Sequence, residues 1–111
     1  MSSDDDVRRL ALALPGTEER TAYGTPAYYA GSRMFARVHE RPGVLLVWRA
    51  DLGEREALLQ GDPDAFFTTD HYDGHPSVLV RLERVDPERL AELLREAWAA
   101  RAPKRLVDSA E

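Results

Sequence analysis

The strongest constraint on the fold is an amphipathic helical pattern at each end of the chain, with short strand patterns between the two. One apolar stripe starts at Val7 and the other at Leu90, and in both the apolar residues recur at i, i+3, i+4 and i+7. We expect Pro15 and Gly16 to end the first helix, and Pro103 to end the second. Each stripe needs an apolar partner, and the segment between them is the only candidate. Both helices are therefore expected to pack on one face of a sheet.

The segment between these helices reads as short strands joined by tight turns. Strands are expected at 18–23, 26–30, 33–39, 44–48, 66–69 and 77–83, with a short helix at 54–60. Gly31-Ser32 suits a two-residue hairpin turn. The run from Val44 to Trp48 is apolar without alternation, which indicates a strand covered on both faces, or a central one. The predicted fold is α+β, an antiparallel sheet with the N- and C-terminal helices packed on one face.

Length and composition set the class of protein. The chain of 111 residues fits a single domain over residues 1–111, and it has no cysteine for disulfides or thiolate metal sites. The acidic N-terminus carries no apolar signal core, and no apolar run approaches the ~20 residues that span a bilayer. We therefore expect a cytoplasmic protein that does not bind a membrane.

The charge is distributed unevenly along the chain. The formal net charge is −5, yet residues 20–50 carry five arginines and one glutamate, a local balance of +4. An acidic chain is a poor candidate for nucleic-acid binding as a whole, because phosphate neutralisation dominates that affinity. A local basic surface can still bind phosphates, so the distribution of charge matters more than its sum.

Several short motifs, in this order and spacing, resemble the MmcQ/YjbR family of small bacterial proteins. The resemblance covers the chain from about Val7 to Leu106. Its motifs are Ala13-Leu14-Pro15-Gly16, Tyr23-Gly24-Thr25-Pro26, Met34-Phe35-Ala36, Thr69-Asp70-His71-Tyr72, Val78-Leu79-Val80, Glu96-Ala97-Trp98 and Ala102-Pro103-Lys104-Arg105-Leu106.

The resemblance implies a CyaY-like, or frataxin-like, fold: a twisted antiparallel sheet with the terminal helices on one face. It also implies DNA binding, since the family is commonly described as binding DNA through a double-wing arrangement of sheet hairpins. The family pattern often has lysine where this chain has Arg33, which keeps the charge but excludes a role that needs a deprotonatable lysine. A frataxin-like fold further raises iron binding by acidic residues such as Asp51, Glu54 and Asp62.

Strict alternation would place Arg33, Phe35 and Arg37 on one open face of a strand, with Met34, Ala36 and Val38 turned toward the helices. Such a row could bind phosphates and stack a base. We predict a non-enzymatic, non-specific DNA-binding surface. Its residues would be Arg33, Phe35, Arg37, Arg49, Arg101, Lys104 and Arg105.

Other interpretations stay open for the same residues. The strand arginines can pair with Glu18, Glu19 or Glu40 on a solvated face, and the cations near Lys104 can simply complement the end of a helix. The same sheet could instead bind an acidic protein partner. Tyr23, Tyr28, Tyr29 and Trp48 could also line a groove for a small ligand.

Catalytic and metal chemistry have weak support in the sequence. His71 and His75 lie near acids in one loop, but nothing completes a metal-ligand set, and an ordered turn around Tyr72 is the simpler interpretation. The serines lack the context of a nucleophile elbow. We therefore expect no enzyme activity, no metal and no cofactor.

Overall fold

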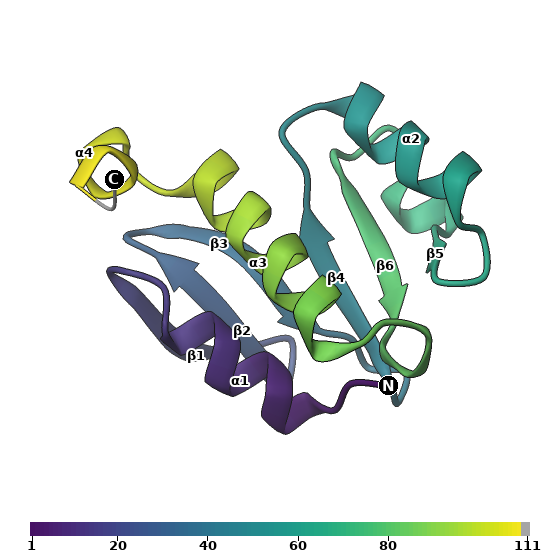
Figure 1. Cartoon of the computed structure of the whole chain (residues 1–111), viewed down its shortest axis with the longest axis horizontal. Helices are drawn as coiled ribbons and strands as arrows, with labels where there is room; N and C mark the ends of the chain where they lie inside the picture. The colour runs from purple at the N-terminus through teal and green to yellow at the C-terminus, as the bar shows by residue number, and fades with distance from the viewer. Residues whose placement is uncertain (110–111) are drawn as a thin grey trace.

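The computed structural model describes residues 1–109 and has the predicted α+β architecture (Figure 1). The strands are β1 (Thr17–Ala22), β2 (Thr25–Ala30), β3 (Arg33–Val38), β4 (Val44–Trp48), β5 (Phe66–Phe67) and β6 (Ser77–Arg81). The helices are α1 (Asp4–Leu12), α2 (Leu52–Gly61), α3 (Pro87–Arg101) and α4 (Lys104–Ser109), with 3₁₀ turns η1 (Asp70–Tyr72) and η2 (Leu82–Arg84). None of the helices in this part of the chain is long and apolar enough to cross a membrane.

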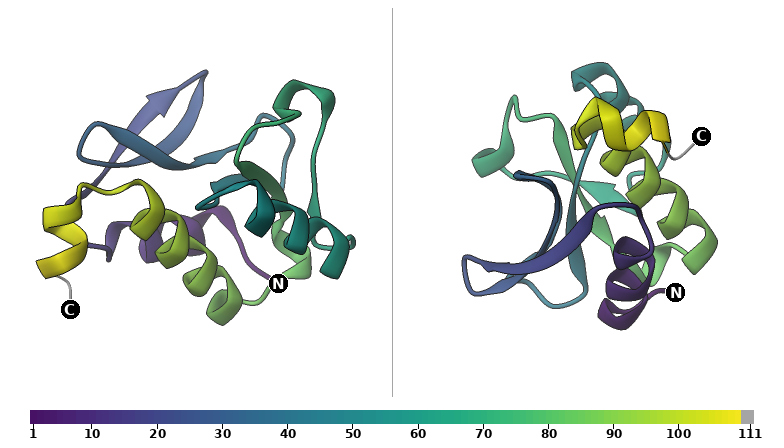
Figure 2. Two further views of the ribbon diagram at one scale, coloured as in Figure 1. Left: turned by 90° about the horizontal axis from the view of Figure 1, so that it is seen from above. Right: turned by 90° about the vertical axis from the view of Figure 1, so that its left-hand side faces the viewer.

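The six strands form one antiparallel sheet in the order β1-β2-β3-β4-β6-β5. Helices α1 and α3 contact each other and cover one face of this sheet, as expected. In the right-hand view of Figure 2 the sheet curves away from these helices, so that its other face is concave. The structure therefore has one helix-covered face and one face that only loops can cover.

Helix starts follow the expected capping chemistry. Ser3 and Asp6 form a capping box at the start of α1, with the Ser3 hydroxyl accepting from the Asp6 amide and the Asp6 carboxylate accepting from the Ser3 amide. At α3, Asp86 accepts a hydrogen bond from the Arg89 amide at 2.8 Å, and Pro87 occupies the first turn. These caps satisfy backbone N–H groups that otherwise have no partner within the helix.

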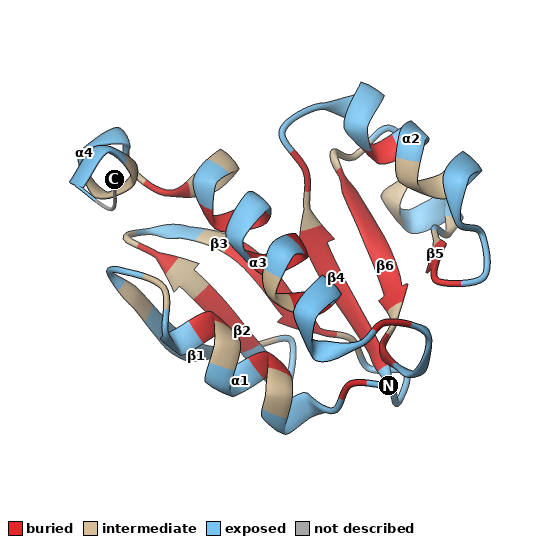
Figure 3. Ribbon diagram, in the orientation of Figure 1, coloured by how far each residue is buried: buried red, intermediate tan, exposed pale blue. Residues whose placement is uncertain are grey.

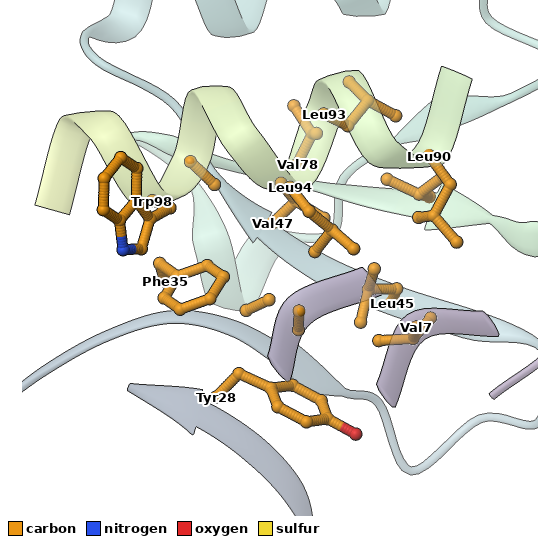
Figure 4. Packing of buried hydrophobic residues seen from close by; sticks show 14 of the residues in the cluster. Val7, Tyr28, Phe35, Leu45, Val47, Val78, Leu90, Leu93, Leu94 and Trp98 are labelled. Atoms are coloured by element: carbon orange, nitrogen blue, oxygen red, sulfur yellow. The ribbon is translucent and has the colours of Figure 1, made fainter. Parts of the chain in front are cut away.

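The main core lies between the two helices and the sheet (Figures 3 and 4). Trp98 of α3 packs beside Phe35 of β3, and Val7 of α1 lies close to Leu45 of β4 (Figure 4). The Trp98 indole Nε1 also donates to the Pro15 carbonyl at 2.9 Å, which ties α3 to the turn after α1. The two amphipathic stripes thus bury each other and the sheet, as their spacing predicted.

A second, smaller apolar cluster lies on the concave face. It is built from Val44, Leu46 and Leu79, with Trp48, Phe67 and Tyr72 packed against them. Alternate residues of β4 belong to different clusters, because Leu45 and Val47 are in the main core. The prediction that this strand is covered on both faces is therefore confirmed.

A β-bulge makes the predicted orientation of β3 wrong at Phe35 and at Met34, which lines the concave face, whereas Ala36 and Val38 face the helices as predicted. Tyr28 pairs with Ala36 and Tyr29 pairs with Met34, so Phe35 is an extra residue in the ladder. Phe35 and Ala36 both belong to the helix-side core, where Phe35 is 0% exposed. Phe35 therefore cannot stack on a base, and it does not share an open face with Arg33 and Arg37.

Smaller differences from the sequence prediction occur at the ends of elements. Strand β6 ends at Arg81, because residues 82–84 turn into η2. Residues 70–76, expected to be a polar loop, contain η1. Helix α4 after Pro103 was not predicted as a separate element.

Replacing Phe35 by Ala should lower the free energy of unfolding by about 3–5 kcal/mol, because it opens a cavity beneath Trp98. Arg33→Ala, two positions away and exposed, should change it by less than about 0.5 kcal/mol. Urea denaturation of both variants measures the difference. A Phe35→Ala protein as stable as the wild type would show that the ring is on the open face after all.

Candidate functional site

The concave face of the sheet holds a groove with a volume of about 670 Å³. It lies between the turn that joins β1 to β2 and the segment around η1, which stand on the same side of the sheet, opposite α1 and α3 (Figure 2). Aromatic rings, imidazoles and a few apolar side chains make up most of its walls. The lining residues are Tyr23, Met34, Arg37, His39, Glu40, Leu46, Trp48, Thr69, His71, Tyr72 and His75.

Arg37 of β3 is the buried cation of this groove, and its charge is paired. Its Nη1 donates to the Glu40 carboxylate at 2.6 Å and to the Thr25 hydroxyl at 3.1 Å, while Nη2 donates to the Tyr72 hydroxyl at 3.2 Å. Burial alone would lower the pKa of Arg37, but the hydrogen bond and charge of Glu40 outweigh it and raise that pKa. The same hydrogen bond lowers the pKa of Glu40. Arg37 is thus a fixed structural cation, only 5% exposed.

Tyr72 is the centre of an aromatic cluster along the groove. Its ring makes edge contacts with His39, His71 and His75, at centroid distances of 6.3, 4.9 and 6.2 Å. His75 in turn contacts the Trp48 ring at 5.1 Å. The cluster connects the Arg37 end of the groove with the Trp48 end.

Burial keeps two of these imidazoles uncharged near neutral pH. It lowers the pKa of His39 even though the nearby Glu40 acts in the opposite direction. It also lowers the pKa of His75, where the positive charges of Arg101 and Arg55 add to the effect. Neutral imidazoles leave the groove able to donate and accept hydrogen bonds without a permanent charge at these positions.

The tip of the β1–β2 hairpin carries a strained aromatic residue. Tyr23 has φ +55°, in the left-handed region, and Gly24 follows with φ +81°, so both turn positions need a conformation that favours asparagine and glycine. The Tyr23 ring lies over the Arg37 guanidinium at 5.1 Å, yet the residue is 83% exposed. A large ring is therefore held at the mouth of the groove, with most of its surface open to solvent.

At the other end, Arg101 from the last turn of α3 contacts two residues of the groove, Met34 and Trp48, although it does not line the groove itself. Its Nε donates to the Met34 carbonyl at 2.9 Å, and its guanidinium lies over the Trp48 ring at 5.0 Å. Burial, and then the positive charge of Arg33, lower the pKa of Arg101. This cation therefore sits in a locally positive environment, unlike Arg37.

Arg55, which sequence reasoning missed, fixes the loop that forms one wall. It is the buried side chain of α2, and it donates to the carbonyls of Ser77 and Tyr72 at 3.0 and 3.3 Å and to the Thr68 hydroxyl at 3.0 Å. An arginine in a short, largely exposed helix reads as surface charge, so its sequence context gave no signal of this role.

The structure separates the seven predicted nucleic-acid contacts into different environments. Phe35 is in the core, and Arg37 is paired with Glu40. Arg49 is 5% exposed and paired with Glu54 and Glu96. The idea that these side chains share one free basic surface is therefore wrong, because burial of the two arginines requires carboxylate partners.

The remaining four predicted contacts lie near one another at one end of the molecule. Arg33 and Lys104 line a second hollow of about 540 Å³, between the β2–β3 turn and the start of α4, which Asp108 also lines. Arg101 is electrostatically coupled to Arg33, and Arg105 is exposed and follows Lys104 in α4. Within residues 1–109, Arg33, Lys104 and Arg105 form no ion pair.

Of the four aromatic residues predicted to line a groove, Tyr23 and Trp48 do so. Tyr28 is 1% exposed in the main core, and Tyr29 lies under Arg20 at 4.8 Å, outside the groove. In the part of the chain that the structure describes, no three His, Asp or Glu side chains gather closely enough to hold a metal ion.

Comparison with known proteins places this geometry in a family. A model of the YjbR family matches residues 12–100. Uncharacterised proteins of Mycobacterium bovis and Mycobacterium tuberculosis are 34% identical, over 98% of this chain and 95% of theirs. The crystal structure of the Deinococcus radiodurans protein DR2400, which carries the domain DUF419, is similar with a TM-score of 0.71 and 28% identity, covering 88% of this chain and 77% of that one.

Replacing Arg55 by Met should loosen the groove wall, because three acceptors in this wall lose a charged donor, as does the Glu56 carboxylate. We expect the free energy of unfolding to fall by about 2–3 kcal/mol. The amides of Tyr72, Asp73 and His75, bonded within this loop, should exchange at least about tenfold faster. Hydrogen exchange and urea denaturation measure the two effects.

Arg84→Met is the matched control for Arg55→Met, because it removes an equal charge from an exposed residue of η2. It should leave both quantities unchanged. If Arg55→Met and Arg84→Met had the same free energy of unfolding and the same amide exchange rates, the role of Arg55 in holding the loop would be contradicted.

Proposed function

This chain belongs to the YjbR family, and we propose that it is a binding module whose concave groove takes up a small, partly apolar ligand. The observation that carries the proposal is the groove itself. Its volume of about 670 Å³ lies in the range of sites for small molecules, roughly 300–1,000 Å³. Mostly apolar walls with a few fixed polar groups are typical of such sites.

The fixed polar groups favour a binding site that exists before the ligand arrives. Arg37 is held by Thr25, Glu40 and Tyr72 together, and Arg55 holds the backbone of Tyr72 from behind. A site that is already ordered loses less conformational entropy when a ligand binds. The groove can therefore contribute its contact area to affinity without first folding around the ligand.

Tyr23 gives independent support to this proposal. A tyrosine in the left-handed region costs about 1–3 kcal/mol, and such strain is concentrated at functional sites. Asparagine would suit the turn better and would give a more stable hairpin. We infer that the exposed ring stacks on the ligand, which explains why a large aromatic side chain occupies this position.

We propose binding rather than catalysis, because the best candidate dyad is inaccessible. His75 Nδ1 lies 2.7 Å from the Ser77 hydroxyl, the distance expected for a base beside a nucleophile. Ser77, however, is 0% exposed, beneath the loop that Arg55 holds. Its hydroxyl cannot reach a substrate in the groove, so the pair serves to orient the His75 ring.

Small aromatic compounds should raise the melting temperature of the protein in a thermal-shift screen. A ligand present at 100 times its Kd stabilises the folded state by about 2.7 kcal/mol through mass action. Thr69→Trp should abolish these shifts. Thr69 lines the groove in extended backbone and its side chain caps nothing, so an indole there fills the cavity without disturbing the fold.

Two further variants sharpen this screen. Gln60→Trp adds the same indole to an exposed position of α2, away from the groove, and should keep the shifts. Tyr23→Asn should keep or raise the melting temperature of the free protein, yet weaken ligand binding. Shifts that survive Thr69→Trp would exclude the groove as the site.

DNA binding is a second candidate function, which the family resemblance implies. The observation in its favour is that Arg33, Lys104 and Arg105 are exposed and form no ion pair within residues 1–109. With Arg101 nearby, these cations could contact phosphates on one strand of DNA. The support is electrostatic only, because the predicted base-stacking residue, Phe35, lies in the core.

If all four cations contact phosphates, the logarithm of DNA affinity should fall with log salt at a slope of about −3.6. The triple variant Arg33→Ala, Lys104→Ala, Arg105→Ala should then lose most of the affinity and flatten the slope. Removing Arg84, Arg89 and Arg95 instead gives the same change in net charge and serves as the control. Equal losses in the two triple variants, or no binding at low salt, would exclude this surface.

A further inference from the structure

Arg101 is the least compensated cation beside the groove. Only its Nε has a hydrogen-bond acceptor, the Met34 carbonyl, and within residues 1–109 neither Nη atom has an acceptor or a carboxylate partner. The side chain is nevertheless half-buried, with its guanidinium over the Trp48 ring. Partly buried charges normally have a partner, so this cation has an unused capacity to bind an anion.

The charges around Arg101 are also positive. Arg33 is the neighbouring charge that acts on it, and Lys104 shares the second hollow with Arg33. The one acid that lines this hollow, Asp108, lies beyond ion-pair distance of every cation in residues 1–109. Arg33, Arg101 and Lys104 thus form a positive cluster, which favours an anion with more than one charge.

This positive cluster adjoins the end of the groove. Met34 and Trp48, which Arg101 contacts, both line the groove, whereas Arg33, the residue before Met34, lines the second hollow. Arg101 lines neither hollow, but its contacts with Met34 and Trp48 place it at the end of the groove, beside the charge of Arg33. A ligand with its ring in the groove could therefore place an anionic group against Arg101, where Arg33 and Lys104 add positive charge.

We propose that the ligand of the groove is an aromatic phosphate monoester, with its ring in the groove and its phosphate on the Arg33, Arg101 and Lys104 cluster. This inference rests on the proposed small-ligand function and names the class of ligand. The ring is assigned because Tyr23, Tyr72 and Trp48 provide aromatic surface along the groove. The phosphate is assigned because a dianion with three acceptor oxygens suits several cations better than a single carboxylate does.

The two ends of the groove fix the orientation of such a ligand. Arg37 is already bonded to Glu40, so an anion at that end would have to compete with a carboxylate. Arg101 presents no such competition within the described residues. The phosphate therefore lies toward α3, and the ring extends toward Tyr72 and Tyr23.

Isothermal titration at low salt with 1-naphthyl phosphate, 1-naphthol and inorganic phosphate tests the proposal. The phosphate ester should bind at least about tenfold more tightly than either of its parts, since one hydrogen bond to a charged group alone strengthens binding by about that factor. Arg101→Met should reduce affinity for the ester at least about tenfold, and change affinity for 1-naphthol by less than about twofold. Thr69→Trp should abolish binding of both aromatic probes.

Matched controls separate local contacts from general charge. Arg95→Met removes the same charge from an exposed position of α3 and should leave the affinity for the ester unchanged. If Arg101→Met fails to fold, the double variant Arg33→Met, Lys104→Met provides the test. Both of its positions are exposed and unpaired, and it should weaken binding of the ester while keeping the melting temperature.

The possible results distinguish the phosphate assignment from ligand binding in the groove. If 1-naphthol binds as tightly as its phosphate, or if Arg101→Met matches Arg95→Met, the phosphate assignment is overturned while ligand binding in the groove stands. Binding of the ester that survives Thr69→Trp also overturns it, because the anion would then bind outside the groove. If no compound binds in this experiment or in the thermal-shift screen, both the proposed function and its ligand class fail.

Discussion

The two faces of the sheet are covered unequally, and the rest of the structure depends on this difference. Helices α1 and α3 bury the side of β4 that carries Leu45 and Val47, but the same strand presents Val44 and Leu46 on the opposite side. Those side chains also need cover, and only loop segments are available there. Phe67, Tyr72 and Trp48 supply part of it. The uncovered remainder of the face is the groove, so the site follows directly from how the fold divides its apolar residues.

A polar loop cannot be held over this face by apolar contact alone. Residues 68–77 contain few apolar side chains, and the free energy gained from burying Tyr72 must offset the ordering of the whole segment. Arg55 provides the missing stabilisation through charged hydrogen bonds to backbone carbonyls. Arg37 adds a bond to the Tyr72 hydroxyl from the opposite side. The two arginines thus act as structural parts of the groove, and their burial reflects that role.

Much of the fold could be predicted from sequence, because periodicity and turn residues report local structure directly. The helical stripes, the Gly31-Ser32 turn and the double covering of Val44–Trp48 all appear as expected. The orientation of Phe35 could not be predicted. Alternation assumes an unbroken ladder, and a single extra residue in β3 exchanges the predicted faces of Met34 and Phe35 while Ala36 and Val38 keep theirs.

The site was less predictable for a related reason. Trp48 and Tyr23 are expected from the sequence to border a groove, but the central ring, Tyr72, is expected only to pack against the sheet within an ordered turn, which it does. Its position is fixed by a hydrogen bond to Arg37, 35 residues earlier in the chain, and by a carbonyl bond from Arg55. Contacts over such separations leave no periodic pattern in the sequence. The groove therefore becomes visible only once the strands and loops are placed together.

The arginines that make residues 20–50 basic do not form one free basic surface on the sheet. Arg37 and Arg49 lie in or beside central strands, where burial of a guanidinium is tolerated only with an acceptor. Glu40 and Glu54, three and five residues further along, supply it. These two arginines of the basic segment therefore stabilise the sheet and do not form an open basic face.

A group of cations without ion pairs lies near the end of α3 and the start of α4, within residues 1–109. There Arg101 lies on Trp48 without a carboxylate within the described residues, and Arg33 opposes its charge. A bound anion stabilises an unpaired cation such as Arg101 more than a paired cation such as Arg37, because no existing ion pair must be broken first. The groove thus has a paired cation, Arg37, at one end and a cation without a carboxylate partner in residues 1–109, Arg101, beside the other, and the proposed orientation of the ligand depends on this difference.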